Sequence, residues 1–570
     1  MQIRTLKNFH IEHQFINKVR SKLLFIIFIT VLIALQSKSQ TIPVGTPALS
    51  EAIRNAQLLG QVDSSISFTV LPIFPVKVFK VDNPFDPFKS MENESWSKTD
   101  GIYRFHKNKW KVQLLPVIWQ QQFNTHHPYS LNDGPMIPAK GYQTMISAGF
   151  FARIGILSIQ LNPEYVYAEN RNFQGLYNEL PANVWNEYNY FHSVIDFPEK
   201  FGEKPYKKLF WGQSSIRLTA GPISIGLSNE NLWWGPGLKN ALLMSNTSPG
   251  FTHLTLNTVK PIHSFIGSFE GQIIGGKLEN SEFQVNARQD ARYINGVVLT
   301  YNPRWTPGLF LGIARSEIAY LNDLKTFKDY MPVVAPFYKK KNYSENESPY
   351  PNDQRVSVFS RWLLPKAHAE IYAEFFKEDH AYDFRDMFLQ LEYTHAYLVG
   401  LTKLIPIIAR PTQFIKFQLE YTKIEQNSAN PWRGGGYLYT HLAGIPQGYT
   451  NKSQLLGPGI GPGSDLLSAE ISWMKGLKKI GIEFERFVHN NDFFNAVIIE
   501  PRAKWVDLNI SAIGQWNWKN LLISSKLIFQ NAYNYEYYYQ PTISENNADY
   551  WASGTNTFNF QAQVAIAYRF

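Results

Sequence analysis

Two carboxylates have a spacing that could support acid–base chemistry on one face of a strand. In "HAEIYAEFF", Glu370 and Glu374 lie on the polar side, with Tyr372 between them. A glycoside hydrolase needs two carboxylates about 5 to 9 Å apart across a cleft, one of them with a raised pKa. In a hydrated channel both would keep nearly ordinary pKa values. We therefore interpret them as channel-lining charges and predict no catalytic residue and no enzyme activity.

Aromatic side chains next to amides form a second set of candidate residues. The stretch "NENLWWGPG" (229–237) contains the candidate ligand-binding residues Asn229, Glu230, Asn231, Trp233 and Trp234. Indoles stack on the C–H faces of sugar rings, while amide and carboxylate groups bond to sugar hydroxyls. The alternative is that both indoles pack a loop that folds into a channel, with Gly-Pro-Gly setting its turn. Such a loop would narrow or close the pore.

A third candidate set lies between residues 425 and 464. Glycines 434–436 are interleaved there with the candidate ligand-binding residues Trp432, Tyr437, Tyr439, His441, Tyr449 and Asn451. Glycine leaves backbone amides exposed for contacts with hydroxyl groups. The alternative interpretation of this stretch is a structural lid.

The N-terminus has the pattern of an export signal. Lys18, Arg20 and Lys22 precede "LLFIIFITVLIAL" (23–35), which is too short to span a bilayer. We expect a signal peptide over residues 1–40, with a short membrane anchor as the alternative. Residues 1–40 carry six Lys/Arg and one Glu, a net +5, which leaves +4 of the formal +9 on the mature chain. The basic balance is therefore poor evidence for nucleic-acid binding, and we expect no nucleic-acid partner.

Composition narrows the class of protein. Aromatic residues make up 15% of the 570 residues and charged residues 18%, and cysteine is absent. The chain therefore has no disulfide, no thiolate metal site and no N-terminal lipidated cysteine, and we expect no cofactor and no metal. After residue 40 no apolar stretch reaches the ~18 residues of a spanning helix. An exported chain of this kind is either secreted or forms a closed β-barrel in an outer membrane.

The C-terminus favours the barrel. In "FNFQAQVAIAYRF" (558–570), apolar and polar side chains alternate, with an aromatic at each end. This alternation is what lipid outside and a polar lumen inside require. A terminal Phe570 also resembles the signal read by the outer-membrane barrel assembly machinery, which we expect as a partner during biogenesis.

The same alternation predicts an all-β fold, a transmembrane antiparallel β-barrel of about eighteen strands over residues 109–570. The predicted strands are 109–123, 142–152, 155–168, 208–219, 222–228, 252–259, 263–276, 292–302, 308–319, 354–363, 368–377, 387–401, 413–424, 465–474, 479–488, 502–513, 520–533 and 557–570. Long and short connections alternate between them, and 402–412 is the longest of the short class. Long loops would then lie outside the cell and both termini in the periplasm. Tyrosines of "NYEYYYQ" (534–540) are expected in an interfacial aromatic girdle, with ligand contact as the alternative.

Residues 41–108 precede the barrel. "PALSEAIRNAQLLGQ" (47–61) predicts one short helix, with Ser50 as its N-cap. The remainder is Pro-rich and is expected to be irregular. We interpret residues 41–108 as a periplasmic segment that packs at or into the barrel base.

Three stretches carry a family resemblance. "NLWWGPGLKNALLMSNTSPGF" (231–251), "GYTNKSQLLGPGIGPGSD" (448–465) and "NDGPMIPAKGYQ" (132–143) resemble the capsule-assembly Wzi family, in the branch found in Bacteroidetes-type bacteria. The resemblance covers essentially the whole mature chain. It implies an outer-membrane barrel with an N-terminal helical periplasmic element and a lectin-like role that holds capsule or exopolysaccharide at the cell surface.

Together these observations predict a non-enzymatic outer-membrane protein of a Gram-negative bacterium that binds or anchors surface polysaccharide. Its expected partners are this polysaccharide and outer-membrane lipid. A channel for polysaccharide or small solutes is the first alternative, because about eighteen strands can enclose a pore. An outer-membrane enzyme acting on glycans or lipids is the second.

Overall fold

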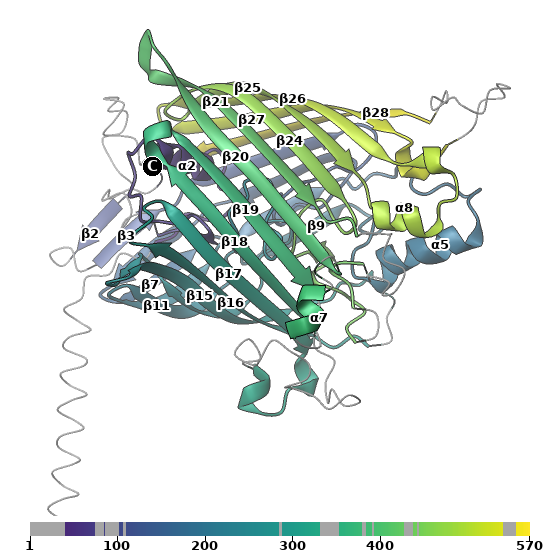
Figure 1. Cartoon of the computed structure of the whole chain (residues 1–570), viewed down its shortest axis with the longest axis horizontal. Helices are drawn as coiled ribbons and strands as arrows, with labels where there is room; N and C mark the ends of the chain where they lie inside the picture. Colours follow the sequence, from purple (N-terminus) through teal and green to yellow (C-terminus); the bar gives the residue numbers. More distant parts are fainter. Residues whose placement is uncertain are drawn as a thin grey trace, which may run out of the picture.

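The computed structural model describes residues 40–74, 85, 102–105, 110–283, 285, 288–330, 353–378, 384–389, 391, 393–426, 437–441, 444–539 and 555–570. Antiparallel strands dominate this part of the chain (Figure 1). Within the described ranges, no helix is both long enough and apolar enough to cross a membrane.

The strands form one continuous wall. In chain order they are β3 (Trp110–Leu114), β4 (Val117–Asn124), β5 (Gly141–Ser147), β6 (Phe150–Ile154), β7 (Leu157–Leu161), β8 (Glu164–Ala168), β9 (Tyr206–Phe210), β10 (Ser215–Ala220), β11 (Ile223–Ser228), β13 (His253–Thr258), β14 (Ile262–His263), β15 (Gly267–Leu278), β16 (Arg292–Pro303), β17 (Leu309–Tyr320), β18 (Asp353–Leu364), β19 (Ala369–Glu378), β20 (His395–Ile407), β21 (Arg410–Lys423), β24 (Asp465–Lys475), β25 (Lys478–Val488), β26 (Val506–Trp518), β27 (Leu521–Tyr533) and β28 (Thr557–Tyr568). All these strands pair antiparallel, from β15 onward with the next strand in the list. Before that, β3 pairs with β6, β5 with β8 and β7 with β10, and both β13 and β14 pair with β15. β28 pairs with β4 from Tyr568↔Val117 to Gln561↔Asn124. Hydrogen bonding thus returns from the last long strand to the first.

Each predicted strand has a counterpart in this wall. The first four predicted strands are each divided in two, as β3/β4, β5/β6, β7/β8 and β9/β10. The breaks lie side by side, since the Leu115 amide bonds to the Gly149 carbonyl and the Gln213 amide bonds to the Asn162 carbonyl. Pro116 and Pro163, which have no N–H donor, lie at two of the breaks.

The β20–β21 hairpin corrects one predicted connection. Residues 402–412 were expected to form a loop, yet pairing continues from Thr402↔Gln418 to Pro406↔Phe414, with an irregularity between Pro406 and Ile407. Pro406 does not stop the strand, because the hairpin ends one residue later. Part of the strand predicted from residue 387 is instead α7 (Phe384–Leu389), and β20 begins at His395.

Side chains of the wall alternate as a membrane barrel requires. On β25, Ile480 and Ile482 point outward and are 56% and 63% exposed, whereas Lys479, Glu483 and Glu485 point into the lumen and are buried. Burial of so many charges means that other parts of the chain fill the lumen.

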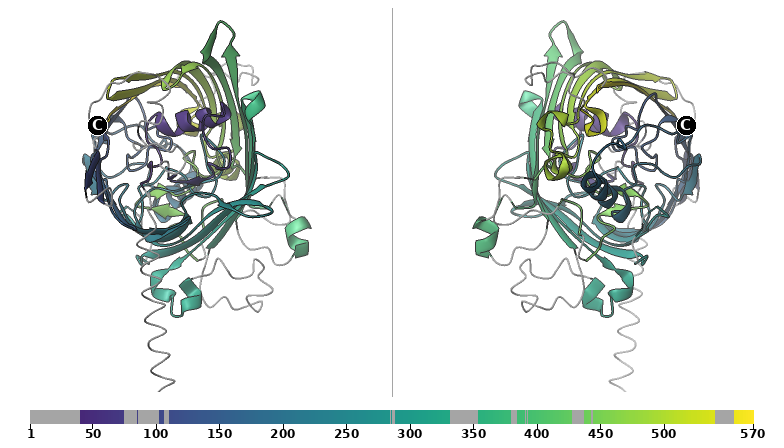
Figure 2. Two further views of the ribbon diagram at one scale, coloured as in Figure 1. Left: turned by 90° about the vertical axis from the view of Figure 1, so that its left-hand side faces the viewer. Right: turned by 90° about the vertical axis from the view of Figure 1, so that its right-hand side faces the viewer.

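The N-terminal segment is one of those parts. Its helix α2 (Leu49–Leu58) lies inside the ring of strands when the barrel is viewed from its end (Figure 2). Ala48 is the N-cap residue and makes no side-chain cap hydrogen bond, so Ser50, predicted for that position, lies in the first turn instead. Two short strands also correct the irregular prediction: β1 (Val70–Leu71), and β2 (Ile102–Phe105), which pairs with β3.

The remaining elements belong to the connections. α5 (Ala182–Asn189) and α8 (Asn491–Val497) lie at the end of the barrel opposite the C-terminus, where the long loops are (Figure 1). Short strands β12 (Trp233–Trp234), β22 (Thr450–Asn451) and β23 (Gln454–Leu455) lie within two of these loops. We call this the long-loop end.

Candidate functional site

The tryptophan pair lies inside the barrel, against the N-terminal segment. Trp233 and Trp234 form β12, which pairs antiparallel with β1 as Val70↔Trp234 and Leu71↔Trp233. Trp234 is fully buried, and its indole Nε1 donates a hydrogen bond to Gln272 Oε1 at 3.0 Å. The indole lies against Gly296 of β16, where a Cβ atom would come within 2.8 Å of the ring. The loop therefore folds inward, as the packing alternative expected.

The residues before the tryptophans hold this loop in place. Glu230 is fully buried and accepts hydrogen bonds from Arg217 Nη2 at 2.6 Å and from the hydroxyl of Thr41. Burial works to raise the pKa of Glu230, but the Arg217 guanidinium outweighs it and holds the pKa below its ordinary value. Asn231 is buried and donates to the Ser248 carbonyl, while Asn229 is half-buried.

The second predicted loop packs onto the first. Tyr439 is fully buried and donates its hydroxyl to the Leu242 carbonyl at 2.9 Å. Asn451, also fully buried, donates to the Pro249 carbonyl at 3.1 Å, and the Tyr449 hydroxyl lies 3.0 Å from Ser316 Oγ on the wall. Trp432 lies outside the described residues. Two stretches 200 residues apart in sequence thus form one core cluster.

Ion pairs tie α2 to the wall. Glu51 accepts from Lys416 of β21 at 2.5 Å and from Lys479 of β25 at 2.7 Å, and Glu470 of β24 lies beside both lysines. Burial works to raise the pKa of Glu51, but the two lysines reverse that effect and lower the pKa. This cluster fixes the start of α2 across the lumen.

The carboxylates considered for catalysis are part of the same packing. Glu370 accepts from Arg54 of α2 at 2.9 Å and from Arg361 at 2.7 Å. Glu374 accepts from Ser357 Oγ at 2.6 Å. Both are almost completely buried, which corrects the expectation of a hydrated lumen around them. Arg54, Arg361 and Ser357 hold the two carboxylates in place, and the described residues form no substrate cleft between them.

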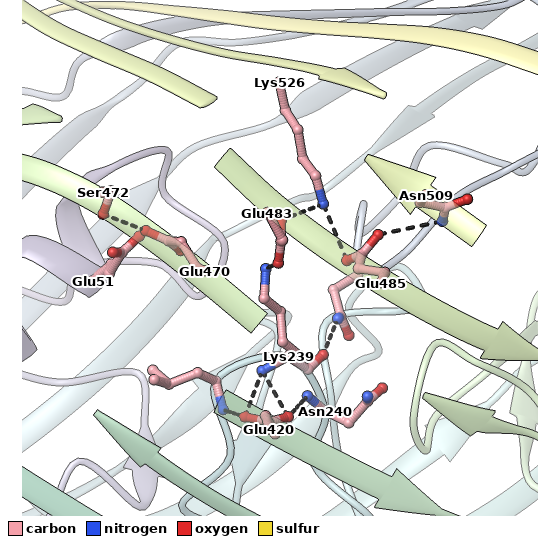
Figure 3. Close-up of polar contacts among 12 residues, drawn as sticks. Glu51, Lys239, Asn240, Glu420, Glu470, Ser472, Glu483, Glu485, Asn509 and Lys526 are labelled. Atoms are coloured by element: carbon pink, nitrogen blue, oxygen red, sulfur yellow. Dashed lines mark hydrogen bonds and ion pairs between the residues drawn. The ribbon is translucent and has the colours of Figure 1, made fainter. Parts of the chain in front are cut away.

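The inward loop adds a third group of charges. The backbone N–H groups of Leu238, Lys239 and Asn240 donate to the Glu420 carboxylate at 2.7 to 3.1 Å. The Lys239 ammonium forms an ion pair with Glu483, which also binds Lys526 at 2.8 Å (Figure 3). Two of the cavities in the described part of the lumen have volumes of about 300 and 320 Å³, and residues Pro43 to Ala48 line both of them.

Aromatic side chains close the long-loop end. We define the aromatic cap as α5, α8 and the aromatic residues around them: Tyr190, Phe191, Phe197, Tyr437, Trp505, Tyr537 and Tyr539, together with the stacked pair Tyr177 and Tyr538 and with Tyr535 against Trp505. Tyr177 and Tyr538 stack with ring centroids 3.9 Å apart, although they belong to different loops. Tyr437 contacts Phe191 at 4.4 Å. Tyr535 and Tyr537 are buried in the cap, which corrects their expected place in an outward-facing girdle.

Comparison with known proteins identifies the family. A model of the family described as "Capsule assembly protein Wzi" matches residues 140–532. The chain belongs to the Wzi family. A solved structure titled as Wzi, an outer-membrane protein involved in group 1 capsule assembly in Escherichia coli and a carbohydrate-binding β-barrel, is similar in fold, with 12% identity, coverage of 93% of this chain and 100% of that chain, and a TM-score of 0.59. The Acinetobacter baumannii protein OccAB2 matches at 9% identity, 80% and 97% coverage, and a TM-score of 0.38. No curated protein sequence matches the chain.

The predicted antiparallel outer-membrane barrel is thereby confirmed. In bacterial outer-membrane barrels the longer loops lie outside the cell, and that this also holds for the long-loop end of this chain stays a prediction. The structure brings the two predicted loops together, but it buries most of their candidate residues. Tyr437, His441 and Asn229 remain partly exposed.

The charged lumen residues were missed by the sequence-based search. Their only sequence signal is a polar side chain at an inward strand position, as at Glu470 and Lys479. Among the residues that the structure describes, no group of three His, Cys, Asp or Glu side chains could hold a metal ion.

Proposed function

We propose that this Wzi-family barrel binds surface polysaccharide on its aromatic cap and does not cleave it. The observation that carries the proposal is the clustering of partly exposed aromatic rings at the long-loop end, which we predict to face out of the cell, above a filled lumen. Tyr177, Trp185, Tyr190, Tyr437, Tyr538 and Tyr539 are neither buried nor fully exposed. Rings held in this way present an apolar face without having to be ordered on binding.

The stacked pair supports a role in ligand binding beyond packing. Tyr177 and Tyr538 come from separate loops, and Tyr539 beside them lies under Arg502, with the guanidinium 4.8 Å from the ring centroid. Aromatic faces next to hydrogen-bonding groups suit the two sides of a sugar ring. A polymer would repeat such contacts along its length, so weak single contacts add up to firm attachment.

The predicted ligand residues divide into two roles under this proposal. The buried ones, Glu230, Asn231, Trp234, Tyr439, Tyr449 and Asn451, build the support for the cap. Tyr437 and His441 belong near the polymer, and the contribution of Trp432 stays a prediction. Assignment to the Bacteroidetes-type branch, the signal peptide over residues 1–40, and the partnership with the barrel assembly machinery and with membrane lipid also remain part of the proposal.

The similar fold of E. coli Wzi, which its title describes as carbohydrate-binding, adds support. The test is binding of the detergent-solubilised protein to immobilised polysaccharide purified from the cells that produce it. A Tyr177→Ala/Tyr538→Ala variant should bind at least about tenfold more weakly, a loss of about 1.4 kcal/mol. Trp305→Ala is the matched control, since Trp305 is 71% exposed in a turn at the opposite end. Equal binding by the double variant, or no binding by the wild type, would contradict the proposal.

A further inference from the structure

One of the two lumen cavities has the features of a separate binding site. This lumenal chamber, of about 300 Å³, is lined by Pro43 to Ala48 and Glu51, by Lys239 of the inward loop, and by residues of strands β4, β5, β25, β26, β27 and β28. Its volume is at the lower end of the range of small-molecule sites. It can hold one or two sugar residues and is far too small for a length of polymer.

The wall of the chamber combines amides, hydroxyls and a few apolar groups. Its lining includes Gln120, Gln122, Gln515, Gln563, Ser147 and Ser524, together with Ile118, Met145 and Ile513. An amide offers both a donor and an acceptor, as sugar hydroxyls require. The apolar side chains suit the C–H faces of a sugar ring.

Two buried acceptors in the lining have no partner among the residues that the structure describes. Asn162 and Glu164 flank the break between β7 and β8 and are 4% and 5% exposed. Glu164 Oε1 accepts from Gln213 Nε2 at 3.1 Å, but Glu164 Oε2 and Asn162 Oδ1 accept no hydrogen bond from the described part of the chain. Buried acceptors are normally satisfied, so this position calls for a ligand that donates hydrogen bonds.

The charges of the lining decide which ligands are excluded. It contains five carboxylic residues, Glu51, Asp133, Glu164, Glu470 and Glu483, and three lysines, Lys239, Lys479 and Lys526. Each lysine already forms ion pairs. Lys239 pairs with Glu483, and Lys479 pairs with Glu51 and Glu470. Lys526 pairs with Glu483 and Glu485. An anionic ligand would therefore find no uncompensated cation and an excess of carboxylates.

We propose that the lumenal chamber binds a neutral, hydroxyl-rich saccharide of one or two residues, at a site distinct from the aromatic cap. Glu164 and Asn162 accept hydrogen bonds from its hydroxyls, and the glutamine and serine side chains bind the remainder. The chamber discriminates against uronic acids and other anionic sugars.

The experiment is calorimetric titration of the detergent-solubilised protein with glucose, galactose, mannose, rhamnose, maltose and lactose, and with glucuronate and galacturonate. At least one neutral sugar should bind, and the uronates should bind at least tenfold more weakly. Glu164→Gln keeps the acceptor for Gln213 but turns Oε2 into a donor, and should weaken the neutral sugar at least tenfold. Ser524→Phe fills the chamber and should weaken the same sugar at least tenfold without touching Glu164.

Glu169→Gln is the matched control, because Glu169 follows the same strand and pairs with Arg171 outside the chamber. It should leave binding unchanged. Absence of binding by all six neutral sugars, equal binding by both chamber variants, or a crystal soak showing only water on Asn162 and Glu164 would overturn the proposal. Polymer binding measured on the same variants separates this result from the proposed function: failure of the chamber leaves polymer binding intact, and failure of the cap leaves sugar titration intact.

Discussion

Glu51 on α2 and Lys479 on β25 meet in the barrel lumen, with the ammonium 2.7 Å from one carboxylate oxygen and 2.9 Å from the other. They lie 428 positions apart in the chain. This pair, with Lys416 and Glu470 around it, is the point at which the N-terminal segment is fastened to the wall. A substitution that breaks these ion pairs should release the N-terminal segment from the wall.

Replacing Glu51 tests this attachment. Glu51→Ala leaves Lys416 and Lys479 buried with only Glu470 to balance them, and breaking one side of a buried ion pair costs up to about 3–5 kcal/mol. We expect α2 to undock and trypsin to cleave after Arg54, which is otherwise buried. The control is Asp63→Ala, which removes an exposed carboxylate from the same segment. Protection of Arg54 in Glu51→Ala would show that the ion pairs do not hold the segment.

Trp234 should support the inward loops more than it serves any ligand directly. Trp234→Ala removes a fully buried indole and is expected to cost about 3–5 kcal/mol. Trp305→Ala, at an exposed turn, should change stability by less than about 0.5 kcal/mol. Unfolding followed by circular dichroism measures both changes. If the two variants were equally stable, the packing of the tryptophan pair would not contribute to the stability of the fold.

The attachment should depend on pH in one direction only. The pKa of Glu51 lies below its ordinary value of 4.5 in the folded protein, so its stabilising effect is complete above that value and is lost as the pH falls through the folded pKa. The contribution of Glu51, measured as the difference in thermal stability between the wild type and Glu51→Gln, should therefore be constant from about pH 8 to 5 and shrink below about 4.5. A Glu51→Gln variant should start lower and decline less. A fall in stability between pH 8 and 6 would show that a group other than Glu51 controls the attachment of the N-terminal segment.

Conductance measurements in planar bilayers distinguish a polysaccharide-binding protein from a channel. With the N-terminal segment and two loops inside the barrel, the wild type should show no steady single-channel current. A variant lacking residues 41–74 should conduct, because that segment fills part of the lumen. Large steady currents from the wild type would favour the channel alternative instead.

Incubation with polymer examines the enzyme alternative. Glu370 and Glu374 are engaged by Arg54, Arg361 and Ser357, so neither is placed to attack a substrate. The wild type should leave the chain length of the polysaccharide unchanged on size-exclusion chromatography, as should Glu370→Gln. Shortening by the wild type that Glu370→Gln abolishes would establish hydrolysis.

The wall of the barrel could be predicted strand by strand, because lipid on one side and a polar interior on the other impose a period of two on each strand. Prediction failed where a local signal had a different cause. Residues 402–412 were expected to form a loop, although the β20–β21 pairing continues through Pro406 and the hairpin turns after Ile407. Tyr535 and Tyr537 matched the pattern of a girdle, but Tyr537 packs against Phe493 of α8 and Tyr535 stacks on His127.

By itself, the sequence determined which residues face lipid, where the long loops emerge and that the chain resembles the Wzi family, because alternation and motif composition are properties of short stretches. Only the tertiary structure decided that Trp234 lies against Gly296, that Glu51 reaches Lys479, and that Asn162 and Glu164 border the lumenal chamber. The physical reason is closure of the sheet. A ring of strands brings inward side chains that are distant in sequence within hydrogen-bonding range. The register of the strands, not the position of the residues in the chain, determines which of them become partners.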